Sequence, residues 1–192
     1  QGLLLYAGTG AVAAVLAADG TLHRAGGRGA VIDDAGGGHW IAREALRHIW
    51  RLEDEAPGRG LATPLGRALA QAVGGEDWAA TRAFVYGASR GELGTLALAV
   101  AAAAAAGDAV AQALLQQAGT ELARLVRALH GRLRQALPVA LAGRVWELHP
   151  AIEAALCAAL PGVAIARSTE PAHTAAARLA AALPHPLETE AR

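Results

Sequence analysis

Residues 3–15 read LLLYAGTGAVAAV, so that a short apolar run leads into Gly8-Thr9-Gly10 and then into a second apolar run. This order predicts a strand, a tight turn and the first arm of a hairpin. The glycines would let backbone N–H groups approach an anion, and the Thr9 hydroxyl can donate to a phosphate oxygen. As an isolated motif, Gly8-Thr9-Gly10 favours the simpler interpretation of a turn between two strands.

The hairpin is predicted to continue from this turn. Its arms are residues 11–17 and 21–25, and they meet at Asp19-Gly20. Asp-Gly is typical of a type I′ turn, which needs positive φ angles at both central residues.

A glycine-rich segment, GGRGAVIDDAGGGHW, follows at residues 26–40 and enters a predicted helix at His39. The positive end of that helix suits an anion or a hydroxyl-rich ligand. Asp33 and Asp34 are candidate acceptors for sugar hydroxyls or for magnesium-bound waters. Two aspartates before glycines are equally typical of a capped turn, so both interpretations stay open. No neighbouring histidine or cysteine set completes a metal site, and none is predicted.

The rest of the chain alternates helical and strand patterns. Amphipathic or capped runs predict helices over residues 39–52, 64–74, 92–106, 108–136, from 150, and over 171–183. The first of these places one apolar face, made of Trp40, Ile41, Ala45, Ile49 and Trp50, opposite a polar face made of Arg43, Glu44, Arg47, His48 and Arg51. Short apolar runs predict strands over 139–143 and 163–168. This strand, helix, strand, helix ending implies a sheet with parallel pairing between helices.

The composition limits the classes of partner. The 192 residues contain 17 Lys and Arg and 17 Asp and Glu, which gives a net charge of zero and no basic block for a nucleic acid. The longest apolar run is about a dozen residues, shorter than the roughly 20 that a membrane span needs. Cys157 is the single cysteine, which indicates a reducing cytoplasm. The chain starts at Gln1 and contains no methionine, so we interpret it as one compact unit from a longer protein.

Two further features of the sequence are candidate sites. The stretch VALAGRVWELHP, residues 139–150, places Gly143 at the carboxyl end of a predicted buried strand, where open α/β sheets bind ligands. It is also typical of an ordinary strand-to-helix connection. The seven histidines show no metal-ligand spacing, which favours solvated or capping roles.

The order of these features resembles the C-terminal half of the N-acetylglucosamine and glucosamine kinases of the BadF/BadG/BcrA/BcrD ATPase family. The resemblance runs from LLLYAGTGAVAAV through GGRGAVIDDAGGGHWIAREAL, FVYGASRGELGTLA and AAAAGDAVAQALLQQAGTEL to VALAGRVW. It implies an α/β fold, one lobe of an actin-like ATPase with a ribonuclease H-like mixed β-sheet, flanking α-helices and a helix-rich second half. Residues 1–184 would be the C-terminal ATPase or kinase lobe, and 185–192 a disordered tail.

The resemblance also implies site residues. The implied ATP-binding residues are Gly8, Thr9 and Gly10, as the second phosphate loop, and Ala142, Gly143 and Arg144, beside the adenosine. The implied sugar-side residues are Gly27, Arg28, Gly29 and Asp34, with Asp34 accepting from sugar hydroxyls. The family motif usually reads Gly-Asp-Glu-Gly-Ser, whereas this chain has Asp33, Ala35 and Gly37 at its first, third and fifth positions and lacks the tryptophan upstream. Each departure removes a hydrogen bond or an apolar platform from the sugar side.

The function implied is transfer of the γ-phosphoryl group of ATP, with Mg²⁺, to a small-molecule amino sugar. In this fold the N-terminal lobe supplies the first phosphate loop and the catalytic base, and neither motif is found here. One alternative is an ATPase that activates a partner reductase through a cluster held by two cysteines from each subunit, which a single Cys157 argues against. Another is a degenerate domain that binds nucleotide or sugar without catalysis. Dimers are common in the family, so a homodimer is an expected assembly.

Overall fold

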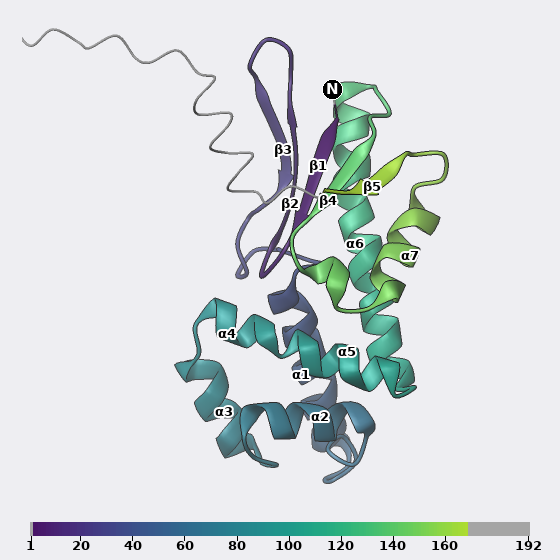
Figure 1. The fold of residues 1–192 in the computed structure, drawn as a ribbon. Coiled ribbons are helices and arrows are strands. Elements are labelled where there is room, and N and C mark those ends of the chain that lie inside the picture. The colour runs from purple at the N-terminus through teal and green to yellow at the C-terminus, as the bar shows by residue number, and fades with distance from the viewer. Residues whose placement is uncertain (1, 169–192) are drawn as a thin grey trace, which may run out of the picture.

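The structure, a computed structural model, describes residues 2–168, and its centre is a five-stranded sheet. The strands are β1 (Leu3–Ala7), β2 (Ala11–Leu16), β3 (Leu22–Gly26), β4 (Val139–Ala142) and β5 (Ile165–Arg167). Their order across the sheet is β3-β2-β1-β4-β5 (Figure 1). The pairs β1–β2 and β2–β3 are antiparallel, whereas β1–β4 and β4–β5 are parallel. The predicted α/β class and mixed sheet are therefore confirmed.

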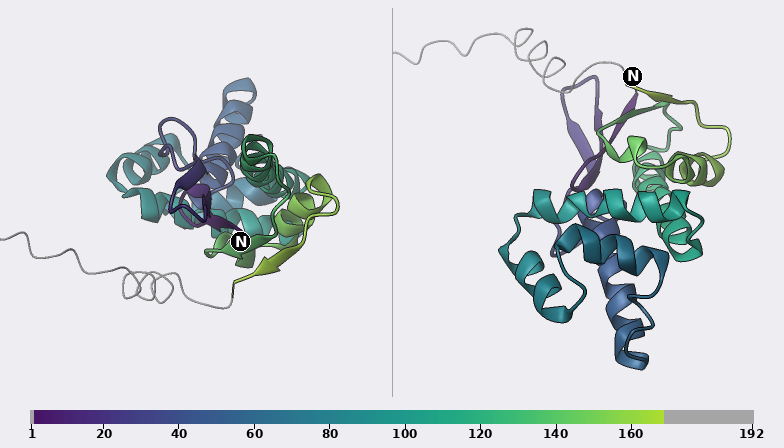
Figure 2. Two further views of the ribbon diagram at one scale, coloured as in Figure 1. Left: turned by 90° about the horizontal axis from the view of Figure 1, so that it is seen from above. Right: turned by 60° about the horizontal axis from the view of Figure 1, so that its bottom comes forward.

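Seven α-helices and one short 3-10 helix accompany the sheet within the described residues. They are α1 (Gly38–Glu55), α2 (Pro64–Val73), α3 (Trp78–Gly87), α4 (Arg90–Thr95), α5 (Ala97–Ala105), α6 (Ala109–Leu133), η1 (Val145–Glu147) and α7 (Pro150–Ala159). Helix α6 packs along the sheet and α7 packs beside it, while α2 to α5 gather at one end of the sheet (Figure 1). The right-hand view of Figure 2 shows α4 and α5 running across that end.

Alternation in the strands creates the core between the sheet and α6. Leu3, Leu5 and Ala7 are buried on β1, and their neighbours Leu4 and Tyr6 are exposed. Across the sheet Leu5 pairs with Ala13 of β2 on one side and with Leu141 of β4 on the other. Helix α6, which packs against β1, β2 and β3, contributes a stripe of buried side chains, among them Leu115, Leu122 and Leu129. Each fully buried leucine of this kind stabilises the fold by about 2 kcal/mol relative to an exposed one.

Local capping fixes where the helices begin, as the sequence predicted. Thr63 Oγ1 accepts from Gly66 N at 2.9 Å at the start of α2. The carboxylate of Asp108 accepts from Val110 N and Ala111 N, each at 3.0 Å, at the start of α6. Its other oxygen accepts from Leu65 N at 3.0 Å, so one buried aspartate joins the beginnings of two helices.

Several local predictions were wrong. Asp19-Gly20 does not form a type I′ turn, because only Gly20 has a positive φ (83°). Instead Ala17 N donates to Thr21 O at 2.9 Å across a three-residue connection. The predicted helix over 92–106 is two helices, α4 and α5, which meet at Leu96, and α3 was not predicted at all.

Glu44 belongs to the predicted polar face of α1, but it is buried, with 7% of its surface exposed. Arg43 and Arg47 supply the compensating charge: Arg43 Nη2 lies 3.1 Å from Glu44 Oε1, and Arg47 contacts the other carboxylate oxygen. A carboxylate can be buried where paired guanidinium groups replace its water. The predicted helix over 171–183, the rest of the lobe to residue 184 and the tail over 185–192 lie outside the described residues.

No helix of residues 2–168 combines the length and the apolar character needed to cross a membrane.

Candidate functional site

The candidate site lies where β1 and β4 end, because parallel strands present their carboxyl ends at the same edge of a sheet. The Gly8-Thr9-Gly10 turn leaves β1 there and is tied to the start of α1. Gly38 N donates to Gly8 O at 2.8 Å, and His39 N donates to Thr9 O at 3.0 Å. These two N–H groups at the helix terminus are therefore used by the turn itself and are not offered to a ligand.

Glycines allow the turn, α1 and α4 to approach one another closely. A Cβ atom on Gly37 would lie 2.7 Å from the Cα of Gly10, and one on Gly38 would lie 3.2 Å from Gly94 O. The first distance is shorter than any ordinary contact between carbon atoms. Close packing therefore accounts for glycine at positions 37 and 38 of this segment, and it holds the turn at the edge of the sheet.

A cavity of about 350 Å³ opens beside this turn. Its walls include Gly8, Thr9, Gly94, Thr95, Leu98 and Arg144. Thr9, Thr95 and Arg144 are exposed polar side chains, and Leu98 adds an apolar wall with 62% of its surface exposed. A pocket of this size with a few polar groups and an apolar wall is typical of a small-ligand site.

The loop after β4 forms the opposite wall. Gly143 has φ 92°, and a Cβ atom there would lie 2.2 Å from Ala7 O, so glycine is required for both reasons. Ala142 O accepts from Trp146 Nε1 at 2.9 Å, which fixes η1. Of the three residues predicted here, Arg144 reaches the cavity wall, while Ala142 and Gly143 shape the loop behind it.

Asp34 lies against Gly10 of the turn and is buried, with 4% of its surface exposed. Its Oδ2 lies 2.9 Å from Nη2 of Arg90, and its Oδ1 accepts from Gly29 N at 3.3 Å. A Cβ atom on Gly10 would lie 2.5 Å from Asp34 Oδ2, so the third residue of the turn has to be glycine for this carboxylate to lie against it. Asp34 itself has φ 62°, a left-handed conformation that aspartate adopts more readily than most residues.

Asp33 has different partners from Asp34. Its Oδ1 accepts from Ala35 N at 3.1 Å, and its Oδ2 lies 3.0 Å from Nη2 of Arg124 on α6. Arg124 also donates from Nε to Glu121 Oε2 at 2.8 Å, and its pKa is raised first by this bond and then by the bond to Asp33. The two aspartates thus separate: Asp33 caps the turn, and Asp34 is the one that adjoins the Gly8-Thr9-Gly10 turn.

The remaining predicted sugar-side residues precede Asp34. Gly27 N donates to Ala11 O at 2.8 Å and continues the hairpin, and Arg28 is exposed. Gly29 is the one that the structure brings onto Asp34. Arg43 of α1 supports this loop through a bond of 3.2 Å from its Nη1 to Ala30 O.

His39 is the second residue of α1, and its charged neighbours include Asp34, Arg43 and Arg90. Its pKa is lowered from the ordinary value, first by burial and then by the positive charges of Arg43 and Arg90, while Asp34 acts in the opposite direction. The neutral imidazole is therefore favoured at neutral pH.

The residues of the cavity fit a nucleotide phosphate chain. Three glycines, Gly8, Gly38 and Gly94, line the cavity without side chains. Thr9 supplies a hydroxyl donor there, Arg144 a positive charge and Glu147 a carboxylate. Over residues 2–168 no group of three or more His, Cys, Asp or Glu side chains is arranged to hold a metal ion. Mg²⁺ bound with ATP takes several of its ligands from phosphates and water, so a cluster of protein ligands is not required.

Sequence reasoning missed the contribution of α4. Arg90, Gly94 and Thr95 all reach the site, yet the helix was predicted to begin only at Glu92. A local signal was present, because Ser89 and Glu92 form a capping box: Glu92 N donates to Ser89 Oγ at 3.3 Å, and Ser89 N donates to Glu92 Oε2 at 2.8 Å.

Comparisons with known proteins agree with this architecture. A solved structure from Chromobacterium violaceum, assigned as an N-acetylglucosamine kinase, is 34% identical with a TM-score of 0.67, covering 81% of this chain and 51% of its own. A second, from Porphyromonas gingivalis and assigned in the same way, has a TM-score of 0.62 at 16% identity, covering 87% of this chain and 56% of its own. The chain thus spans about half the length of each, and its fold is that of one part of an actin-like ATPase.

A search of curated proteins returned no match. The match to a protein family is broad and includes every site residue described above, since it extends over residues 1–180. The chain belongs to the BadF/BadG/BcrA/BcrD ATPase family.

Proposed function

We propose that this chain is the ATP-binding part of an amino-sugar kinase, which transfers the γ-phosphoryl group of ATP to a hydroxyl of N-acetylglucosamine or glucosamine. The observation that carries the proposal is the juxtaposition of a glycine-lined cavity of about 350 Å³ with a buried carboxylate. Gly10 separates the two, since its Cα packs directly against Asp34 while Gly8 and Thr9 line the cavity. The 34% identical structure assigned as an N-acetylglucosamine kinase supports the choice of substrate class.

Each group has a defined task in this proposal. Thr9 and the glycines of its turn hold the phosphates, and Arg144 and Leu98 form the walls on the nucleoside side. Asp34 accepts from sugar hydroxyls and orients the ring. Magnesium bound with ATP would neutralise phosphate charge, and positioning together with such charge stabilisation accounts for most of the catalysis in phosphoryl transfer. The catalytic base is expected in the N-terminal lobe, and the cytoplasm is the expected setting. A homodimer stays a prediction.

The test is a coupled assay of ADP release by the complete encoded polypeptide, with N-acetylglucosamine, glucosamine and glucose as acceptors. We expect amino-sugar-dependent turnover that requires Mg²⁺. Asp34→Asn should lower kcat/KM for the sugar by about 100-fold, because one charge-assisted acceptor is lost in a buried site. Asp33→Asn is the matched control, since Asp33 contacts Arg124 and Ala35 instead of the turn. Equal losses in both variants would contradict the role given to Asp34.

A non-catalytic domain that binds nucleotide or sugar is the second candidate, and one contact favours it. Arg90 occupies an oxygen of Asp34 that a sugar hydroxyl would use. Under this alternative, ATP binds with saturation and no acceptor sugar stimulates ADP release. The same assay, preceded by a calorimetric titration with ATP, separates the two functions.

A further inference from the structure

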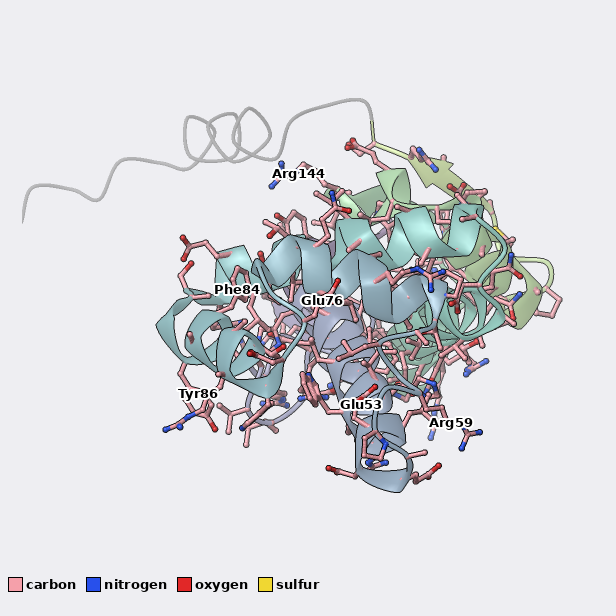
Figure 3. The ribbon with its side chains drawn as sticks, turned by 90° about the horizontal axis from the view of Figure 1, so that it is seen from below. Glu53, Arg59, Glu76, Phe84, Tyr86 and Arg144 are labelled. Atoms are coloured by element: carbon pink, nitrogen blue, oxygen red, sulfur yellow. The ribbon has the colours of Figure 1, made fainter. Side chains whose placement is uncertain are left out.

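A second and larger cavity, of about 610 Å³, lies between α1, α3 and α4. Its walls include three arginines and three aromatic residues beside apolar side chains such as Leu46, Val85 and Leu93. The arginines are Arg43, Arg47 and Arg90, and the aromatic residues are Trp50, Trp78 and Tyr86. It shares no wall residue with the cavity beside the Gly8-Thr9-Gly10 turn. Figure 3 shows Tyr86 and Arg144, one from each cavity, on opposite sides of α4 and α5 in that view.

The aromatic side chains present open ring surface. Trp50 and Trp78 meet edge to face, with ring centroids 5.2 Å apart and an angle of 72° between the planes. Trp78 is 52% exposed and Tyr86 is 80% exposed, which is unusual for two large aromatic residues in one cavity wall. Such rings offer apolar faces on which the C–H surface of a pyranose can pack.

The charges of the wall leave a positive excess. Glu44 is shared by Arg43 and Arg47, and Asp34 is paired with Arg90, so three guanidinium groups face two carboxylates. The lowered pKa of His39 agrees with a positive potential here, since the charges of Arg43 and Arg90 both contribute to it after burial. Guanidinium groups bind phosphate in a bidentate manner, and all three are partly exposed.

We propose that the cavity between α1, α3 and α4 is a binding site for a sugar phosphate, whose phosphate contacts Arg47 and Arg90 and whose ring packs on Tyr86 and Trp78. The positive excess selects an anion, and the exposed rings select a ligand with an apolar face. The positive excess and the exposed rings are not part of the nucleotide cavity, because the two cavities share no wall residue.

Arg90 would link this site to Asp34. The helix α4 turns Arg90 and Leu93 toward the second cavity and Gly91, Gly94 and Thr95 toward the first. A phosphate that binds Arg90 competes with Asp34 for the same guanidinium group, so occupancy of one site changes the affinity of the other, and the change is reciprocal. This coupling, unlike the binding itself, rests on the proposed function of Asp34.

The experiment is isothermal titration calorimetry of the protein without ATP, using N-acetylglucosamine 6-phosphate as the probe and N-acetylglucosamine and inorganic phosphate for comparison. Because no catalysis is involved, the result does not depend on kinase activity. Arg47→Gln removes a wall charge, and Tyr86→Ala removes a ring that is largely exposed and contributes little to folding. Arg51→Gln is the matched control, an exposed arginine one turn further along α1 that does not line the cavity. Thermal melts verify that each variant is folded.

We expect the sugar phosphate to bind and the two comparison compounds to bind about tenfold more weakly or worse. Arg47→Gln and Tyr86→Ala should each weaken the sugar phosphate by about tenfold, and Arg51→Gln should leave it unchanged. Asp34→Asn should leave it unchanged or tighter, because Arg90 is then released. The proposal is overturned by an absence of binding up to about 10 mM. It is also overturned if Asp34→Asn weakens binding while Arg47→Gln and Tyr86→Ala do not, because the probe would then be bound as a product beside Asp34.

Discussion

Asp34 and Arg90 are 56 residues apart in the chain, and their side chains meet with Oδ2 of the aspartate 2.9 Å from Nη2 of the arginine. The aspartate is buried, whereas the side chain of the arginine is 58% exposed. The pair joins the loop before α1 to the first residue of α4. It therefore connects the sugar side of the site to the helix that borders both cavities.

A double-mutant cycle measures what this pair contributes to stability. We expect Asp34→Asn and Arg90→Gln, alone and combined, to give a coupling free energy of about 1 kcal/mol in urea denaturation. The value is modest because water screens the exposed arginine. Arg82→Gln, at an exposed position on α3, replaces Arg90→Gln in a control cycle and should couple to Asp34→Asn by nearly zero. Equal coupling in both cycles would show that the contact is not made in solution.

The pKa of His39 depends on the charges of both Asp34 and Arg90, so it can be used to test the same pair. Arg90 lowers this pKa and Asp34 raises it, so Arg90→Gln should move it up and Asp34→Asn should move it down. Titration of the His39 ring protons by NMR measures both. Arg82→Gln again serves as control, and shifts of the same sign in the two site variants would be inconsistent with the structure.

The lowered pKa of His39 also gives a direction for stability against pH. The folded state holds this proton less tightly than the unfolded chain, whose histidine titrates near 6.5. Between the folded pKa and 6.5 the unfolded state binds more protons, so the free energy of unfolding falls as pH falls through this window. We expect urea denaturation at pH 7.5 and at pH 5.5 to show that the free energy of unfolding falls more between these two pH values for the wild type than for His39→Gln. An equal loss would assign the acid sensitivity to other groups.

The nucleotide cavity can be tested through its apolar wall. Leu98 is 62% exposed there, so Leu98→Glu should fold normally yet weaken ATP binding at least about tenfold, because a charged carboxylate would replace the apolar wall on the nucleoside side and lose its water when the nucleotide binds. Leu22→Glu is the matched control, because Leu22 is 63% exposed on the distant hairpin. Calorimetric titration with ATP compares them, and equal affinities would place the nucleotide elsewhere.

Local rules of sequence predicted most of the framework. Two apolar runs on either side of a glycine turn identified β1 and β2, and single side chains such as Thr63 and Asp108 marked where helices begin. These signals are local because backbone capping and strand pleating act over a few residues. The predicted helix over 92–106 failed at Leu96 because an alanine-rich run carries too little periodicity to show a break.

The site was less predictable for a physical reason. Nothing near Asp34 indicates that Arg90 will pair with it, and nothing near Glu44 indicates burial, because both outcomes depend on how distant helices pack. The different roles of Asp33 and Asp34 likewise depend on distant partners, since Asp33 pairs with Arg124 on α6 and Asp34 with Arg90 on α4. The resemblance to a kinase family pointed to Asp34, but only the fold explains why its neighbour has a different role.

Two glycines on α6 allow packing to be separated from helix propensity. A Cβ atom on Gly119 would lie 2.1 Å from Ile152 O of α7, whereas one on Gly131 would meet nothing within 4 Å. Gly131→Ala should raise the free energy of unfolding by about 0.5–1 kcal/mol, because alanine loses less backbone freedom in a helix. Gly119→Ala should lower it by about 1–3 kcal/mol, because α7 has to move away from α6. Urea denaturation of both variants measures the two signs, and stabilisation by Gly119→Ala would mean that α6 and α7 are not in the close contact described.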